Sequence, residues 1–292
     1  MIISKIERQK KDKQRYSLFV DDQFLLGIDE TVLIHFALHK GQAVDDELLA
    51  RLKEAEYHQK VYSKAIHYIS YGQRTIKEMR DYLGKIPALN EEELRSEADK
   101  ESTEEIAVID DSLINEIIER LLRQQYLNDL IYGQSYVRTT ALINRKGPSL
   151  IQQELLRKGL SEDEILKALE EYPVAQQIEN IQHLAQKYIR TKKNVPFERL
   201  KNKLYEHLLI KGFDSDLVKQ EMQQLDYDYS EEHQDDLLNK TADKIVRTRQ
   251  KKYSGYDLRN KVREGLYRKG FDFEAINHWL EDHAELWENT DD

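Results

Sequence analysis

A lysine–glycine pair followed by an apolar residue occurs three times in the second half of the chain. The three glycines, Gly159, Gly212 and Gly270, are separated by 53 and 58 residues. Each has apolar residues eight and four positions before it and six and ten positions after it. Spacings of four place both members of each apolar pair on one face of a helix. The repetition therefore predicts a helix, a glycine corner and a second helix, written three times.

The residue types around each corner are typical of helix ends. A glycine just past a helix adopts a positive φ without Cβ strain, and the apolar residue after it packs against the helix it closes. Ser161, Asp214 and Asp272 come next, where a side-chain oxygen caps the following helix. The lysine before each glycine lies in a last helical turn, where the helix dipole favours a cation. We interpret the three lysines in that way.

A second recurring element, an apolar pair followed by Arg-Thr, precedes each corner at Arg138, Arg190 and Arg247. Proline or a Ser-Gly pair separates it from the corner, so it belongs to a separate, earlier helix. Each repeat thus contains three helices. An imperfect copy comes first, with a capping-box pattern at Thr75 and Glu78 but without the Lys-Gly corner.

We predict a mainly α-helical protein whose tandem three-helix repeats form an elongated, curved array. A small β-hairpin and helix segment precedes the array. In it, "RYSLFV" and "FLLGI" flank Asp21-Asp22-Gln23 as hairpin strands do, and Gly41 is expected to end a helix. The expected boundaries are 1–56 for the N-terminal segment and 57–128, 129–175, 176–230 and 235–288 for the four repeats.

Acidic residues are concentrated in one stretch. The formal net charge is −10, and residues 88–111 contain ten acidic and two basic residues, so −8 lies there and −2 elsewhere. An acidic stretch poor in aromatic residues is typical of a solvated insertion. We therefore assign 88–111 as an insert in the first repeat. The remaining surface is close to neutral and leaves room for local basic faces.

Missing residue types and motifs exclude several classes of protein. There is no cysteine, which excludes disulfides, thiolate metal sites and a cysteine nucleophile. No apolar run approaches the roughly 18 residues of a membrane span, and the N-terminus has no signal-peptide core. A soluble, cytoplasmic protein without membrane contacts is expected. No phosphate-binding loop, nucleophile elbow or zinc-protease motif occurs. We expect no enzymatic activity, no cofactor and no metal.

Two patterns have a chemical alternative. His35 and His39 are four residues apart and would share one helix face, where a third ligand would complete a metal site; surface imidazoles are the simpler interpretation. Paired aspartates, as at 21–22 and 235–236, lie at expected turns and helix starts. Capping explains such pairs better than acid–base catalysis.

Short basic stretches begin at the recurring arginine of the last three repeats: "RTTALINRK", "RTKK" and "RTRQKK". We call them the basic lips. Dipole pairing at a helix end is one explanation of the arginines. The other is partner binding, because equivalent cations on a stacked array form a stripe that suits a periodic, negatively charged or filamentous polymer. The candidate partner-binding or DNA-binding residues are Arg138, Lys146, Arg190, Lys192, Lys193, Arg247, Arg249, Lys251 and Lys252.

Together these features resemble the RecX family, the bacterial regulators of the RecA recombinase. The resemblance rests on the tandem three-helix units, on Tyr136-Val137-Arg138-Thr139, on "IQQELLRKGL" at 151–160 and on "LLRQQYLND" at 121–129. The N-terminal segment resembles the longer version found in Gram-positive relatives. The resemblance covers essentially the whole chain.

The resemblance implies a non-catalytic regulator that lies in the helical groove of the RecA–DNA filament and bridges neighbouring protomers. Such a regulator inhibits the filament's ATPase, strand exchange and co-protease activities, and so modulates homologous recombination and the SOS response. The implied partners are the RecA filament and single-stranded DNA, reached through the filament or directly. We expect the chain to be a monomer. The alternative function is a stand-alone helical-repeat protein that binds DNA without a recombinase.

Overall fold

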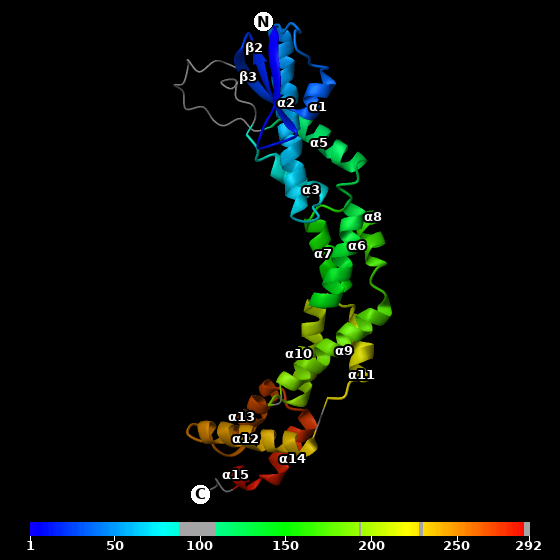
Figure 1. Ribbon diagram of the computed structural model, residues 1–292. Helices are drawn as coiled ribbons and strands as arrows, with labels where there is room; N and C mark the ends of the chain where they lie inside the picture. Colours follow the sequence, from blue (N-terminus) through cyan, green and yellow to red (C-terminus); the bar gives the residue numbers. More distant parts are fainter. Residues whose placement is uncertain (88–108, 193, 228–229, 289–292) are drawn as a thin grey trace. The chain divides into compact units, whose positions relative to one another are not determined.

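The computed structural model describes residues 1–87, 109–192, 194–227 and 230–288 (Figure 1). The chain forms two compact units: residues 1–132 together with 158–161, and residues 133–157 together with 162–292. As expected from the sequence, the fold is mainly α-helical, with one small sheet near the N-terminus. None of the helices in the described ranges combines the length and the apolar character that a membrane span requires.

The N-terminal sheet has three antiparallel strands in the order β1-β2-β3. The predicted hairpin is present as β2 (Arg15–Val20) and β3 (Gln23–Asp29). Asp21 and Asp22 at its turn have positive φ values of 47° and 66°, and two such residues give a turn whose twist fits a hairpin. The prediction missed β1 (Ile3–Arg8), which pairs with β2. Only two of its six residues are apolar, so the sequence gives a weak strand signal there.

Two helices follow the sheet, α1 (Glu30–His35) and α2 (Asp46–Ser70), and both contribute apolar residues to the core cluster of the sheet (Figure 1). The expectation that Gly41 ends a helix is wrong, because α1 already ends at His35. Gly41 has a φ of +87°, but it lies in a turn, and its N–H donates to the carbonyl of Ile3 at 2.8 Å. Its left-handed conformation therefore joins this turn to β1.

The first repeat contains α2, α3 (Ile76–Leu83) and α5 (Asp111–Arg123), which share one core cluster. The predicted capping box is confirmed, since Thr75 and Glu78 bond each other's backbone N–H groups. Gly84 after α3 has a φ of −62°, so it lacks the left-handed conformation that the glycines of the three corners adopt.

The acidic insert assigned to 88–111 lies mostly outside the described residues. Its last three residues are described, and they belong to the fold. Ile109 is buried in the core of the first repeat, the Asp110 side chain accepts a hydrogen bond from the Leu113 N–H, and Asp111 begins α5. The sequence-based assignment included these residues in the insert because the aspartates at 110 and 111 were counted with the acidic run, although four apolar residues, 106–109, separate them from it.

The helices of the remaining repeats follow in chain order. The second repeat has α6 (Asp129–Thr139), the π-helical turn η1 (Thr140–Asn144), α7 (Pro148–Arg157) and α8 (Glu162–Leu169). The third has α9 (Val174–Thr191), α10 (Phe197–Ile210) and α11 (Ser215–Gln223). The fourth has α12 (Glu231–Arg249), α13 (Gly255–Lys269), α14 (Phe273–Asp282) and α15 (Glu285–Glu288).

The three glycine corners have the predicted geometry. Gly159, Gly212 and Gly270 have φ values of +93°, +89° and +93°. The side chains of Asp214 and Asp272 cap α11 and α14, as predicted. The apolar pairs before the corners are fully buried: Ile151, Leu155, Leu204, Leu208, Val262 and Leu266.

Each corner also contacts the preceding repeat, which the sequence did not predict. The carbonyl of the corner lysine accepts a hydrogen bond from a residue at or near the start of the preceding repeat's second helix. We call this contact the inter-repeat joint. The three hydrogen bonds are Thr75 Oγ1 to Lys158 O at 2.8 Å, Gly147 N to Lys211 O at 2.7 Å, and Arg199 Nη1 to Lys269 O at 3.3 Å. The same residues that end one helix thus dock it to its neighbour.

Candidate partner-binding site

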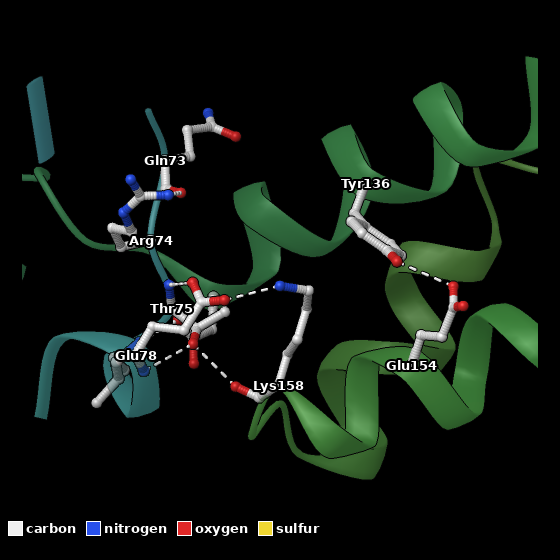
Figure 2. A network of polar contacts seen from close by, with 9 residues as sticks. Gln73, Arg74, Thr75, Glu78, Tyr136, Glu154 and Lys158 are labelled. Atoms are coloured by element: carbon white, nitrogen blue, oxygen red, sulfur yellow. Dashed lines mark hydrogen bonds and ion pairs between the residues drawn. The ribbon is translucent and has the colours of Figure 1, made fainter. Parts of the chain in front are cut away.

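The lysine of the first corner takes part in an ion pair at its joint. Lys158 Nζ lies 2.7 Å from Glu78 Oε1 (Figure 2) and 5.3 Å from the centre of the Tyr132 ring. Burial acts to lower the pKa of Lys158, but hydrogen bonds to Glu78 and Tyr132 outweigh it and the pKa is raised. Burial likewise acts to raise the pKa of Glu78, and hydrogen bonds from Lys158 and the Thr75 backbone lower it overall. The helix-dipole interpretation therefore does not fully describe Lys158, which also forms an ion pair with the preceding repeat.

The two candidate cations in the basic lip of the second repeat, Arg138 and Lys146, both pair with a carboxylate but differ in exposure. Arg138 is half exposed, and its Nη1 lies 3.1 Å from Glu171 Oε2. Lys146 is mostly buried and pairs with Glu154, which also accepts a hydrogen bond of 2.9 Å from Tyr136 Oη (Figure 2). Burial acts to raise the pKa of Glu154, and the bonds from Lys146 and Tyr136 lower it overall. Lys146 thus ties the end of this lip to α7.

Between these two cations, the lip contains the π-helical turn η1, which the sequence did not predict. Leu142 and Ile143 in this turn are 61% and 70% exposed. Arg145 ends the turn with a φ of +49°. Wide turns of this kind are frequent at functional sites. The lip therefore offers apolar as well as cationic side chains.

The lip of the third repeat borders a cavity of about 880 Å³. Arg190 and Lys192 line it together with Asp226 and His233. This cavity is of mixed charge. Lys193, also a candidate, lies outside the described residues.

The lip of the fourth repeat divides between two surfaces. Arg249 lines a cavity of about 790 Å³, which we call the basic groove, and Arg247 lines a smaller one of about 430 Å³. Lys251 and Lys252 are exposed in the turn between α12 and α13. The wall of the basic groove comes from α10, α12 and α13. Its cations are Arg199, Lys240, Lys244, Arg249, Arg268 and Lys269.

Sequence reasoning found only one of these six cations, Arg249. A signal for two others exists, because Lys240, Lys244 and Thr248 are spaced by four on α12 and so share one helix face. Arg199 and Arg268 lie on other helices, and only the packing of the third repeat against the fourth brings them to the same groove.

The proposed shared helix face of His35 and His39 does not exist. His35 is the last residue of α1, and His39 lies in the following turn with its Nδ1 3.1 Å from the Ala37 carbonyl oxygen. In the described part of the chain, no three or more histidine, cysteine, aspartate or glutamate side chains gather closely enough to hold a metal ion.

Comparison with known proteins agrees with this architecture. The family model for the regulatory protein RecX N-terminal domain matches residues 1–45, and that for the second three-helix domain of RecX matches residues 128–169. The model for the third three-helix domain matches twice, at 175–222 and 232–280. The chain belongs to the RecX family. The double match means that the fourth repeat of this RecX-family chain resembles its third.

Full-length relatives give the same result. A regulatory protein RecX of Oceanobacillus iheyensis is 34% identical over 284 residues, which are 96% of this chain and 97% of the relative. A regulatory protein RecX of Bacillus cytotoxicus has the same identity and coverage. A crystal structure of a regulatory protein RecX is 32% identical and aligns with a TM-score of 0.61, covering 75% of this chain and 98% of that one.

Proposed function

We propose that this RecX-family chain is a non-catalytic regulator that binds the RecA recombinase filament on DNA. Bound along the groove of the filament, it inhibits ATP hydrolysis, strand exchange and co-protease activity, and so modulates recombination and the SOS response. The chain acts as a monomer and meets single-stranded DNA through the filament.

The observation that carries the proposal is the recurrence of one arrangement in three consecutive repeats. Each of these repeats has an exposed arginine, Arg138, Arg190 or Arg247, in the last turn of its first helix. Each also uses its glycine corner to dock to the repeat before it. A repeated surface on repeated units favours a partner that is itself periodic. Several linked contacts on such a partner raise the overall affinity although each is weak alone.

The test is RecA-catalysed ATP hydrolysis on single-stranded DNA, measured with increasing amounts of this protein. We expect inhibition at amounts well below one protein per RecA protomer, because one molecule contacts several protomers. Unchanged hydrolysis at equimolar protein would refute the proposal.

A second experiment distinguishes binding to the RecA filament from binding to DNA alone. The protein is added to labelled single-stranded DNA that is either bare or coated with RecA, at rising salt. Phosphate contacts weaken steeply with salt, so preference for the coated DNA at physiological salt is expected. A preference for bare DNA would favour the stand-alone DNA-binding function.

A further inference from the structure

The basic groove combines one sign of charge with an apolar floor. Six cations line it, and no acidic residue does so among the residues that the structure describes. The rest of the lining is apolar apart from Gly265 and three uncharged polar residues, Asn194, Thr241 and Thr248. The apolar residues are Val195, Pro196, Leu237, Ile245 and Phe271.

Most of this positive charge is not neutralised by the chain itself. Within the described ranges, no ion pair joins Lys244, Arg249 or Arg268 to a carboxylate. Lys240 pairs with Asp236 at 3.6 Å, but both side chains are largely exposed. An exposed pair of this kind contributes little and opens easily.

Glu264, which precedes the lining residue Gly265, is a carboxylate beside the groove, and it already has a partner. Glu264 accepts a hydrogen bond of 3.0 Å from Lys261. The pKa of Glu264 is lowered mainly by this bond and the charge of Lys261, with smaller effects of Arg268 and Arg249. The groove is therefore a site for an anion supplied from outside.

Two observations distinguish an acidic peptide from a nucleic acid. Sites for single-stranded nucleic acid pair a basic groove with aromatic rings on which bases stack. Among the described residues that line the groove, Phe271 has the only aromatic ring, and it is 7% exposed. The other apolar lining residues, Val195, Pro196, Leu237 and Ile245, are aliphatic, and aliphatic side chains of a peptide can pack on them as they do in peptide grooves.

We propose that the basic groove binds a short acidic peptide segment of a protein partner, with aliphatic residues interspersed between its carboxylates. The carboxylates meet the guanidinium groups of Arg199, Arg249 and Arg268, whose geometry suits bidentate pairing. The aliphatic side chains cover Leu237 and Ile245. A cavity of about 790 Å³ holds a few residues of a peptide, not a folded domain. The site does not require the partner to be the RecA filament, so it stands apart from the function proposed above.

The test is selection of random 12-residue peptides displayed on phage against the full-length protein. The groove variant is Lys244→Glu with Arg268→Glu, since neither side chain makes a structural ion pair. The control variant is Lys203→Glu with Lys219→Glu, two exposed cations outside the groove with the same change in charge. If the groove variant does not fold, Lys244→Gln with Arg268→Gln replaces it.

We expect the enriched peptides to alternate Asp or Glu with Leu, Ile or Val. Their binding should fall by about tenfold or more in the groove variant and with rising salt, and remain in the control variant. Replacing the aliphatic residues of a selected peptide with serine should also weaken binding. Enrichment without acidic residues, or equal binding to the groove variant, overturns the proposal. So does binding of a labelled dT20 oligonucleotide that is lost in the groove variant while no peptide is enriched, because the occupant would then be nucleic acid.

Discussion

The amide of Gly147 donates a hydrogen bond of 2.7 Å to the carbonyl of Lys211, and at this joint the two backbones lie in direct contact. A Cβ placed on Gly147 would lie 2.2 Å from the carbonyl carbon of Gly212. The second and third repeats therefore approach as closely as they do because a glycine stands on each side. Proteins tolerate such approach only where the side chain is absent.

Gly147→Ala should destabilise the protein by about 1–3 kcal/mol, the usual range for overpacking a tight contact. The Cβ would meet backbone atoms, which cannot move aside without opening the joint. Urea unfolding of the full-length protein measures the loss. Gly84→Ala is the matched control, since its Cβ would lie 3.4 Å from the Arg80 carbonyl oxygen, at ordinary contact distance. Equal effects of the two substitutions would show that the joint does not limit stability.

Gly212→Ala should cost more than Gly41→Ala, although both glycines have nearly the same φ, +89° and +87°. Left-handed backbone strain alone costs an alanine about 1–2 kcal/mol. At Gly212 the new Cβ would also lie 2.5 Å from the backbone nitrogen of Leu150, whereas at Gly41 nothing lies within 4 Å. The difference between the two unfolding free energies isolates the contribution of the joint. No difference would mean that only φ matters at the corner.

Glu78→Gln should remove part of the acid sensitivity of folding. The folded-state pKa of Glu78 is lowered, so its stabilising effect is present above its unfolded pKa of about 4.5 and is lost as pH falls through the folded value. Glutamine keeps the capping box but not the charge. The variant should be less stable than wild type at pH 7, with a difference that shrinks as the pH falls below about 4.5.

The raised pKa of Lys158 makes stability depend on pH at the alkaline end of the range, opposite to the effect of Glu78. Its stabilising effect is full below the unfolded pKa of about 10.5 and disappears only at more alkaline pH. Within this ion pair, the change in stability at acidic pH is therefore due to Glu78 and not to Lys158. Urea midpoints at pH 7, 5, 4 and 3 test the prediction for Glu78→Gln. A difference from wild type that stays constant over this range contradicts it.

Reversing the charge at Arg138, Arg190 and Arg247 together should weaken inhibition of the RecA ATPase more than any single reversal, if the basic lips contact the filament. Linked contacts fail together once several are weakened. The control reverses three other exposed cations in ion pairs with their own helices: Lys167, Lys203 and Lys219. Circular dichroism confirms that both triple variants remain helical. Normal inhibition by the arginine variant would leave the helix dipole as the explanation of these residues.

Local structure was largely readable from the sequence. The three corners, the capping box at Thr75 and the caps at Asp214 and Asp272 were predicted because each depends on residues within one or two helical turns. Two predictions of local structure were wrong, at positions where the sequence pattern was weak. The charged strand β1 was missed, and Gly41 was assigned to a helix end when its positive φ serves a turn.

The sequence by itself determined the period of the repeats and the ends of their helices, since these follow from short-range spacing and chemistry. Its resemblance to the RecX family was confirmed by comparison with known proteins. Only the tertiary structure showed which residues of neighbouring repeats contact one another. It placed Gly147 against Gly212, matched Lys158 with Glu78, and gathered Arg199, Lys244 and Arg268 around one groove. These partners are 24 to 80 residues apart. Such contacts depend on how whole helices pack, and no local pattern of residues encodes that geometry.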